Sequence, residues 1–449
     1  MIMKSKEWTP GSWRNFEALQ QPTWDKDALE KVFKELESLP PLVFAGEIRS
    51  LRSSLEKVEC GEGFVLQAGD CAESFDAFSA PAIREKLRVI LQMAVVLTYQ
   101  SGVPTVKIGR IAGQFAKPRS EDIEARGDVT LPSYRGDMVN DIEFNESARV
   151  AKPKRLIRGY NQSASTLNLL RAFTKGGFAD LSRIHEWNKE FVATTPEGHR
   201  FEKIAKNISK ALEFMKACGI DPENEHTLHE VDFYTSHEAL LLDYEQALTR
   251  KDSTTGDFYD CSAHLVWIGE RTRQLNNAHV EFMRGINNPI GIKLGPSTTG
   301  KDAKELCDAL NPNREHGKIV LVIRAGADNI EDVAPKIMEK VAKSGHPVTW
   351  MSDPMHGNTF KHASGYKTRH FDDILKEIEG FFASCSKTGV WPGGVHLELT
   401  GDDVTECLGG LDDLANLESR YETRCDPRLN ARQGIDLAFR VSELLAARH

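Results

Sequence analysis

The sequence predicts an α/β protein built as a (β/α)₈ barrel. The stretch Ser262–Ser297 reads as strand, helix and strand, with apolar runs at Leu265–Ile268 and Pro289–Leu294. Such alternation is typical of a parallel sheet. Eight strand-like runs alternate with helices along the chain, the number that a (β/α)₈ barrel needs. The alternative, an open doubly wound sheet, is disfavoured because no glycine-rich dinucleotide turn follows any strand.

The first part of the chain reads as an extension followed by two barrel units. Residues 1–60 carry tryptophans among prolines and charges, and we expect them to pack this arm onto the body or onto another subunit. A strand at Gly63–Ala68 precedes a helix at Ala82–Tyr99, and a second strand follows at Val103–Ile108. Leu131–Asp141 is a polar loop.

The third strand, Glu230–Tyr234, comes more than a hundred residues after the second. A βα unit needs only about 30 residues, so the interval carries an insertion. One barrel helix is expected at Ser163–Phe173, and two further helices are expected at Leu181–Phe191 and His199–Cys218. We interpret residues 181–228 as an inserted helical element with a regulatory or interface role, within a single barrel domain that spans residues 1–449.

From the third strand onward the alternation is regular. The expected strands are Leu265–Ile268, Pro289–Leu294, Ile319–Ile323, Val348–Met351 and Gly394–Leu399. The expected helices are His237–Leu248, a segment with Leu275, Ala278 and Phe282 on one face, Lys301–Leu310, Ile330–Ala342, Phe371–Phe382 and Arg432–Ala447.

Composition limits the class of protein. The 449 residues carry a net charge of −9, so no overall basic field recruits nucleic acid or an anionic membrane. Eight cysteines without disulfide-like spacing indicate a reducing compartment. No apolar run approaches a membrane span, and the N-terminus lacks the apolar core of a signal peptide. We therefore expect a cytoplasmic protein.

Cations follow the predicted strands at their carboxyl ends, where parallel α/β folds place their ligands. Arg110, Arg271, Lys293 and Arg324 lie at strand tips, and Lys117, Arg119 and Lys367 lie in adjoining loops. Each could instead pair with a nearby acid. On an acidic chain, however, cations gathered at one face favour an anionic small molecule, because arginine offers paired donors to phosphate or carboxylate.

A second set of residues at the strand tips could bind a metal ion. Cys71, His356, Glu398 and Asp426 offer one thiolate, one imidazole and two carboxylates, a mixed set that suits Mn²⁺, Co²⁺ or Zn²⁺. No short metal motif is present, and each residue has an ordinary structural alternative as a buried thiol, a turn residue, a cap or an ion-pair partner. His396 is a rival ligand, ranked lower because it would lie one layer deeper.

Nine segments resemble the type II 3-deoxy-D-arabino-heptulosonate 7-phosphate (DAHP) synthases, in the long, allosterically regulated form. The resemblance covers nearly the whole chain, including the arm and the insertion. The segments are QAGDCAE (67–73), KIGRIAGQFAKPRS (107–120), WIGERTRQ (267–274), GIKLGPS (291–297), DPMHGNT (353–359), GYKTRHF (365–371), HLELTG (396–401), TECLGG (405–410) and RYETRCDPRLN (420–430).

The resemblance implies a metal-dependent transferase. Such an enzyme condenses phosphoenolpyruvate with D-erythrose 4-phosphate and water to DAHP and phosphate, the first step of the shikimate pathway to chorismate and the aromatic amino acids. It implies metal ligation by Cys71, His356, Glu398 and Asp426. It also implies phosphoenolpyruvate binding by Arg110, Glu270, Arg271, Lys293 and Arg324, and none of these nine departs from the family pattern. The candidates for erythrose 4-phosphate are Lys117, Arg119, Ser120 and Lys367.

Further expectations concern roles, cofactor and partners. Glu270 and Lys293 are the expected catalytic residues, with Glu270 orienting water or stabilising positive charge. We expect one divalent ion, Mn²⁺ foremost with Co²⁺ and Zn²⁺ as alternatives. A homodimer or homotetramer, aromatic amino acid effectors and a complex with a chorismate mutase are implied. The sequence leaves open whether Cys71 and Cys425 form a redox disulfide. Competing hypotheses are another metal-assisted aldol reaction on a sugar phosphate and a catalytically silent regulatory partner.

Overall fold

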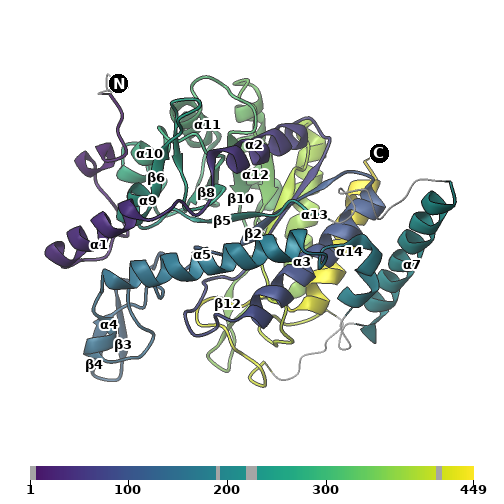
Figure 1. The fold of residues 1–449 in the computed structure, drawn as a ribbon, viewed down its shortest axis with the longest axis horizontal. Helices are drawn as coiled ribbons and strands as arrows, with labels where there is room; N and C mark the ends of the chain where they lie inside the picture. Colours follow the sequence, from purple (N-terminus) through teal and green to yellow (C-terminus); the bar gives the residue numbers. More distant parts are fainter. Residues whose placement is uncertain (1–6, 189–192, 219–229, 411–416, 449) are drawn as a thin grey trace.

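The computed structural model describes residues 7–188, 193–218, 230–410 and 417–448. Its centre is a closed barrel of eight parallel strands in the order β1-β14-β11-β10-β9-β8-β5-β2 (Figure 1). The predicted (β/α)₈ barrel is thus confirmed. The barrel strands are β1 (Phe64–Gly69), β2 (Thr105–Arg110), β5 (Tyr234–Glu238), β8 (Leu265–Ile268), β9 (Ile290–Leu294), β10 (Ile319–Ile323), β11 (Thr349–Ser352) and β14 (Gly394–Glu398).

Helices surround the barrel, and sequence signals set their ends. Asn430 and Gln433 form a capping box at the start of α14, and the left-handed Gly389 (φ 71°) ends α13. The last helix, α14, packs against the first barrel helix, α3, which joins the two ends of the fold. These helices are α3 (Ala80–Ser101), α5 (Lys154–Lys175), α9 (Leu242–Leu248), α10 (Ala278–Met283), α11 (Gly300–Leu310), α12 (Ile330–Ala342), α13 (Phe371–Thr388) and α14 (Ala431–Ala446).

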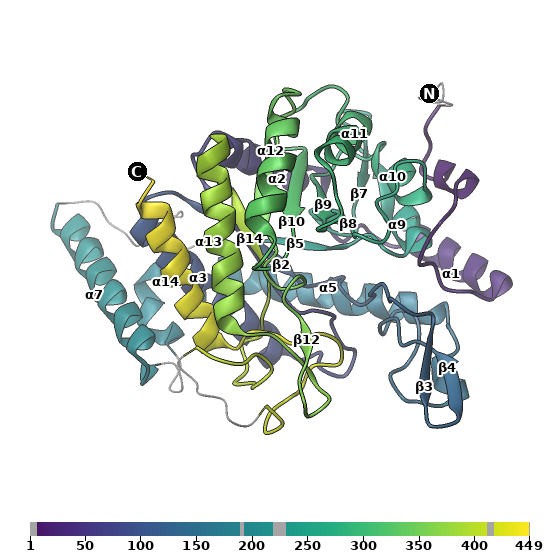
Figure 2. The ribbon, with the colours of Figure 1, turned by 180° about the vertical axis from the view of Figure 1, so that it is seen from behind.

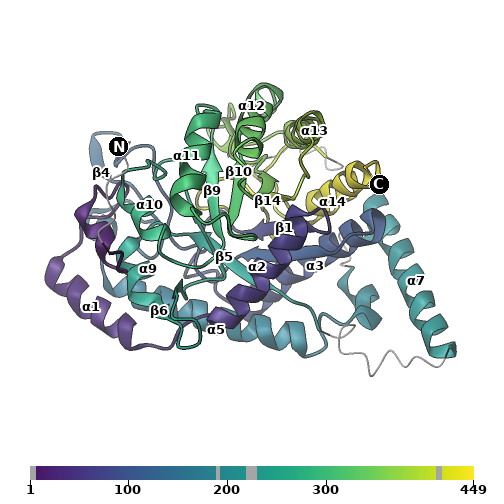
Figure 3. The ribbon, with the colours of Figure 1, turned by 90° about the horizontal axis from the view of Figure 1, so that it is seen from above.

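The N-terminal extension contains a short 3₁₀ turn, η1 (Ser12–Asn15), and two helices, α1 (Lys26–Ser38) and α2 (Ala45–Glu59). Helix α2, which the sequence analysis did not identify, packs against β1 and β11. Figure 3 shows it beside β1. Its residues Leu51, Leu55 and Val58 are fully buried in one cluster with barrel residues such as Val65 and Ile108. This apolar contact closes the N-terminal end of the barrel.

The insertion lies at the edge of the molecule, against α3 and α14 (Figure 2). Its second expected helix is α7 (Pro196–Ala217), which buries Phe201, Ile204 and Ala205. In place of the first it has a 3₁₀ segment, η2 (Leu181–Trp187), and part of the range predicted for that helix lies outside the described residues.

Further elements decorate the loops. They are the hairpins β3 (Ile123–Arg126) with β4 (Val129–Pro132), β6 (Thr249–Lys251) with β7 (Phe258–Asp260) and β12 (Phe360–Lys361) with β13 (Lys367–Thr368), and helix α4 (Glu146–Arg149). Across the described ranges, no helix combines the length and apolar character that crossing a membrane requires.

The position predicted for the third barrel strand, Glu230–Tyr234, was wrong by four residues. The strand is β5, and its residues Thr235, Ser236 and His237 are polar yet buried. Their partners lie inside the protein: Ser236 Oγ receives a bond from Gln67, and His237 Nε2 lies 3.0 Å from Glu245 Oε1. Hydrophobic patterning cannot detect a strand whose buried side chains are polar.

Lys318, directly before β10, is a buried lysine whose pKa links the stability of the fold to pH. Its ammonium donates to the carbonyl of Ile286. Burial, together with the Arg52 guanidinium, lowers the pKa of Lys318 to about 7, although Glu315 and Asp257 act in the opposite direction. The unfolded chain therefore binds more protons above this pKa, and the stability of the wild type rises with pH until the ordinary lysine pKa is reached.

We expect Lys318→Met to lose this pH dependence. From about pH 7 to about pH 9 the free energy of unfolding of the wild type should rise, relative to that of the variant, by on the order of 1 kcal/mol per pH unit. Urea unfolding at both pH values measures the difference. Lys343→Met, at an exposed lysine, is the control and should follow the wild type. Equal slopes for Lys318→Met and the wild type would contradict the prediction.

Candidate active site at the carboxyl end of the barrel

The barrel interior changes from apolar to charged along the strands. Near the closed end, Val65, Ile108 and Leu265 belong to one apolar cluster. One layer higher, Gln67 donates to Ser236 Oγ (2.9 Å) and its Oε1 lies 2.7 Å from His396 Nδ1. His396, the rival ligand considered from the sequence, thus lies in this middle layer.

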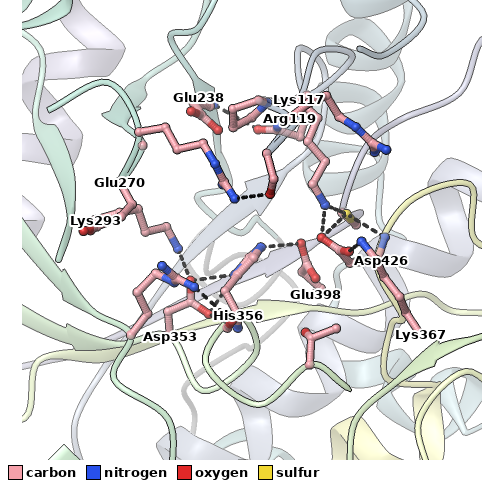
Figure 4. Close-up of a pocket in the computed structure, with 18 of the residues that line it drawn as sticks. Lys117, Arg119, Glu238, Glu270, Lys293, Asp353, His356, Lys367, Glu398 and Asp426 are labelled. Carbon is pink, nitrogen blue, oxygen red and sulfur yellow. Dashed lines mark hydrogen bonds and ion pairs between the residues drawn. The ribbon is translucent and has the colours of Figure 1, made fainter. Parts of the chain in front are cut away.

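The third layer, at the carboxyl ends of the strands, is charged although it is buried. Arg110 Nη2 lies 3.1 Å from Glu398 Oε1, and Lys293 forms an ion pair with Asp353. These four side chains are at most 6% exposed. Buried charges persist only when they are paired or face a ligand. The pairs found here hold both signs of charge at the floor of a cavity (Figure 4).

The cavity, about 580 Å³ in volume, brings together every site residue predicted from the sequence. Residues from eight strand ends and their loops line it, although they are spread over more than 350 positions of the chain. The predicted residues on its wall are Cys71, Arg110, Lys117, Arg119, Ser120, Glu270, Arg271, Lys293, Arg324, His356, Lys367, Glu398 and Asp426.

Three of the four proposed metal ligands converge closely. The ligand atoms of Cys71, Glu398 and Asp426, all buried, lie within 4.8 Å of one another. His356 adjoins this group through Glu398, with its Nε2 3.0 Å from Glu398 Oε1. A thiol and two carboxylates beside an imidazole form the mixed donor set that Mn²⁺, Co²⁺ and Zn²⁺ accept.

Positive charge already lies against these donors. Lys117 Nζ is 2.7 Å from Cys71 Sγ and forms an ion pair with Asp426, and Lys367 Nζ is 2.9 Å from Asp426 Oδ1. Burial alone would raise the pKa of Asp426, but Lys117 holds it below its ordinary range. Burial raises the pKa of the Cys71 thiol, and contact with Cys425 adds to this rise. The carboxylate of Asp426 thus stays charged beside two ammonium groups, whereas burial favours the neutral form of the Cys71 thiol.

Two residues orient the ligands from behind. Asp353 Oδ2 lies 2.8 Å from His356 Nδ1, so the other ring nitrogen faces the donor group. Arg369, fully buried, donates to Glu398 Oε2 (2.8 Å) and to the carbonyl of Pro427 next to Asp426. Such contacts fix the ring and the carboxylate in place, as is common around metal-binding histidines.

The sequence analysis missed Glu238, Trp267 and Asp353 on the cavity wall. Glu238 ends β5 and was missed because that strand was placed too early. Among the described residues, its buried Oε1 has no hydrogen-bond partner. Burial raises the pKa of Glu238 to about 6, although Lys293 lowers it. Asp353 could have been found from the sequence, because it follows a predicted strand and lies three positions before His356, close enough for a carboxylate to contact the histidine ring.

Glu270 has a different environment. Arg273 donates to both of its carboxylate oxygens (2.8 and 3.2 Å), and the backbone N–H of Gly295 donates to one of them. Glu270 is thus held as a fixed hydrogen-bond acceptor at the cavity wall.

Comparison with known proteins decides the family. The profile of the class-II DAHP synthetase family matches residues 8–442. This chain belongs to the class-II DAHP synthetase family. It is 57% identical to a phospho-2-dehydro-3-deoxyheptonate aldolase of Streptomyces coelicolor. The aligned 436 residues cover 96% of each of the two chains. It is 50% identical over 435 residues to the phospho-2-dehydro-3-deoxyheptonate aldolase AroG of Mycolicibacterium smegmatis, covering 95% of this chain and 92% of that one.

The resemblance found in the sequence is thus confirmed. The chain is an enzyme, a DAHP synthase, and its reaction is the first step of the shikimate pathway. The catalytically silent partner considered earlier does not fit this finding.

Arg369 allows a test of the supporting contacts. We expect Arg369→Gln to lower the free energy of unfolding by about 3–5 kcal/mol, because it leaves the buried Glu398 carboxylate without one of its partners. Urea unfolding of the metal-free protein measures the loss. Arg420→Gln breaks an exposed pair with Asp403 and should cost about 0–1 kcal/mol. A similar, small effect of both changes would show that Arg369 does not support the site.

Proposed function

We propose that this cavity condenses phosphoenolpyruvate with D-erythrose 4-phosphate and water, giving DAHP and phosphate, with the aid of one divalent metal ion. The observation that carries the proposal is the meeting, in one cavity, of a thiol–carboxylate donor group and a ring of cations. Both substrates are anions, and phosphoenolpyruvate carries a phosphate and a carboxylate. A cavity for two such molecules needs more positive charge than a metal ion alone supplies.

Phosphoenolpyruvate is assigned to Arg110, Glu270, Arg271, Lys293 and Arg324. Arg324 supports the assignment because its buried Nε, within the described part of the chain, lacks a hydrogen-bond partner. Its Nη2 donates to the carbonyl of His356 (2.9 Å), which fixes the guanidinium at the wall. A guanidinium N–H left unpaired in a buried site favours binding of an anion.

Erythrose 4-phosphate is assigned to Lys117, Arg119, Ser120 and Lys367. Arg271 Nη2 donates to Ser120 Oγ (2.7 Å), so the two proposed substrate regions adjoin. Lys117 and Lys367 also contact Asp426. The residues assigned to the sugar phosphate therefore adjoin the proposed metal ligands, which supports binding of this substrate next to the metal.

Cys71, His356, Glu398 and Asp426 would hold the metal, with Mn²⁺ preferred and Co²⁺ or Zn²⁺ as alternatives. The bound ion would act as a Lewis acid that polarises the aldehyde oxygen. Arg110 and Lys293 would hold the enol phosphate, since both are buried cations on the cavity wall.

Proton transfer falls to the carboxylates beside Lys293. As the new carbon–carbon bond forms, the aldehyde oxygen takes up a proton and becomes a hydroxyl, and C2 becomes electron-poor. A water oxygen then bonds to C2 and gives up a proton, which balances the one taken up, and the bond between C2 and the phosphate oxygen breaks to leave a ketone and phosphate. Glu238, with its unpaired oxygen near Lys293, is placed to accept the proton of that water. Glu270, held by Arg273, would orient the water or stabilise the positive charge at C2.

Organisation and regulation remain proposals of the same kind. We assign residues 1–449 to one cytoplasmic barrel domain, with residues 1–60 as an extension and residues 181–228 as a regulatory or interface element. Support comes from the exposed Phe214 (69%) on α7, a surface suited to a homodimer or homotetramer. We propose aromatic amino acid effectors and a chorismate mutase partner as well, because the resemblance to the long, allosterically regulated form implies them.

Phosphate release tests the function. We expect the purified protein with Mn²⁺ to release phosphate only when both substrates are present, and a chelator to abolish the release until Mn²⁺ is restored. Arg324→Gln should lower kcat/KM roughly a hundredfold, because it removes a charged contact to the anion. Arg200→Gln on α7 is the control and should behave as wild type. Turnover that survives the chelator contradicts the metal, and an inactive but folded, metal-loaded protein contradicts the reaction.

Glu238 is tested by an isosteric change. We expect Glu238→Gln to lower kcat by about 10²–10⁴, with both KM values nearly unchanged, because the amide keeps the shape but cannot accept the proton. Steady-state kinetics measure the change. Glu121→Gln replaces an exposed carboxylate on the same cavity wall and serves as the matched control. An unchanged kcat in Glu238→Gln would remove this residue from proton transfer.

A further inference from the structure

The N-terminal arm is fixed along the outside of the barrel before it reaches the loop that carries Arg119. Trp8 Nε1 donates to the carbonyl of Glu281 (3.0 Å) on α10, and Trp13 Nε1 donates to Gln246 (2.9 Å) on α9. The backbone N–H of Ala278 donates to the carbonyl of Glu17 (3.0 Å). Figure 3 shows the arm beside α9 and α10. The path of the arm is therefore set by the barrel helices.

Beyond these contacts the arm reaches the loop that begins at Lys117. Gln20 Oε1 accepts a bond from the backbone N–H of Arg119 (2.8 Å) and a second from Arg135 Nη1 (3.2 Å). The backbone carbonyl of Gln20 also accepts from Arg135 Nη1 (3.4 Å). One side-chain oxygen thus joins the arm to two positions of a loop that is about a hundred residues away in sequence.

Gln20 adopts an uncommon backbone conformation to make these contacts. Its φ of 61° lies in the left-handed region, which residues other than glycine rarely occupy. Such a conformation persists only when the surroundings hold it in place, and it often occurs at functional sites. Here the contacts with α9 and α10 hold the chain before Gln20, and the bonds to Arg119 and Arg135 hold Gln20 itself.

The loop that Gln20 contacts carries the residues assigned to erythrose 4-phosphate. Lys117 N–H donates to the carbonyl of Arg135 (2.9 Å), and Arg119 Nη2 donates to Glu124 (3.1 Å). Ser120 Oγ accepts from Arg271 (2.7 Å). In this set of contacts the backbone of Arg119 is held by the arm. Arg135 contacts both Gln20 and Lys117, so it transmits the same constraint.

We propose that Gln20 is a positioning residue for the sugar phosphate: through Arg119 and Arg135, it fixes the loop that binds the phosphate of erythrose 4-phosphate. This inference rests on the proposed assignment of that substrate to the loop. A phosphate is bound well only when several donors point at it together, and small displacements of such groups cost large factors in rate or binding. Of the phosphoenolpyruvate residues, Arg110 and Lys293 lie on barrel strands, and Glu270, Arg271 and Arg324 follow strands closely. Arg271 contacts the loop through Ser120, and none of the five bonds to Gln20 among the described contacts.

The neighbouring Gln21 provides a matched control. Its Nε2 donates to the carbonyl of Leu240 (2.6 Å), and its Oε1 accepts from the backbone N–H of Leu242 (3.2 Å). Gln21 therefore ties the same arm to the same barrel by two hydrogen bonds, at the start of α9 and not at the phosphate loop.

The experiment compares Gln20→Met, Gln20→Glu and Gln21→Met in the full-length enzyme with Mn²⁺. Methionine keeps the size of glutamine and lacks the oxygen acceptor, whereas glutamate keeps the acceptor. For Gln20→Met we expect KM for erythrose 4-phosphate to rise roughly tenfold to a hundredfold, with KM for phosphoenolpyruvate and Mn²⁺ affinity within twofold of wild type. Gln20→Glu should restore most of the lost affinity, and Gln21→Met should leave both KM values unchanged.

The outcomes separate this inference from the function on which it rests. If the wild type does not consume erythrose 4-phosphate, the proposed function fails. If the wild type is active and Gln20→Met leaves KM for erythrose 4-phosphate unchanged, only the role of Gln20 is overturned. Equal rises in both KM values, or the same rise in Gln21→Met, also overturn it, because they indicate a general loosening of the arm. If Gln20→Met fails to fold, Gln20→Asn replaces it, because the side chain of asparagine is one methylene shorter and its oxygen cannot reach Arg119. An unchanged KM for erythrose 4-phosphate in Gln20→Asn then overturns the role of Gln20.

Discussion

The buried carboxylate of Glu398 is the point on which the site depends. It is fully buried, and Arg110, Arg369 and His356 all contact it. An isolated carboxylate in such a place would be strongly disfavoured, so these partners are required for the charge to persist. Each of these partners also makes a second contact or lines the cavity. Arg110 lies on the cavity wall, Arg369 donates to the backbone carbonyl of Pro427, and His356 contacts Asp353. The folding of the barrel and the assembly of the site therefore share the same contacts.

The sequence predicted most of this architecture because strands with apolar side chains end in charged residues. Lys293, for example, follows an apolar run, and its position at a strand tip could be inferred directly. The strand β5 could not be placed in this way, since Thr235, Ser236 and His237 find their partners only in the folded barrel. Glu238 was lost with it. Helix α2 was also missed, because its apolar residues pack beneath a barrel that patterning alone cannot position.

For the candidate site, too, the sequence predicted some features and not others. Residue types and their order along the chain were enough to collect the four donors and the cations. Which of them bond to one another could not be predicted: that Lys117 contacts Cys71, or that Glu270 is held by Arg273, depends on side-chain geometry. The contact of Gln20 with Arg119 is a further case, because almost a hundred residues separate them and neither lies in a regular element of the barrel.

The apolar packing of α2 against one end of the barrel affects how substrates and products can enter and leave. Among the described residues, Leu51 and Leu55 pack against apolar barrel residues at one end, and the cavity lies at the carboxyl-terminal end. The same cavity wall carries the buried Arg110 and Lys293 and the half-exposed Lys367. Lys367 thus offers a positive charge to anions in solvent, whereas Arg110 and Lys293 are reached only from within the cavity.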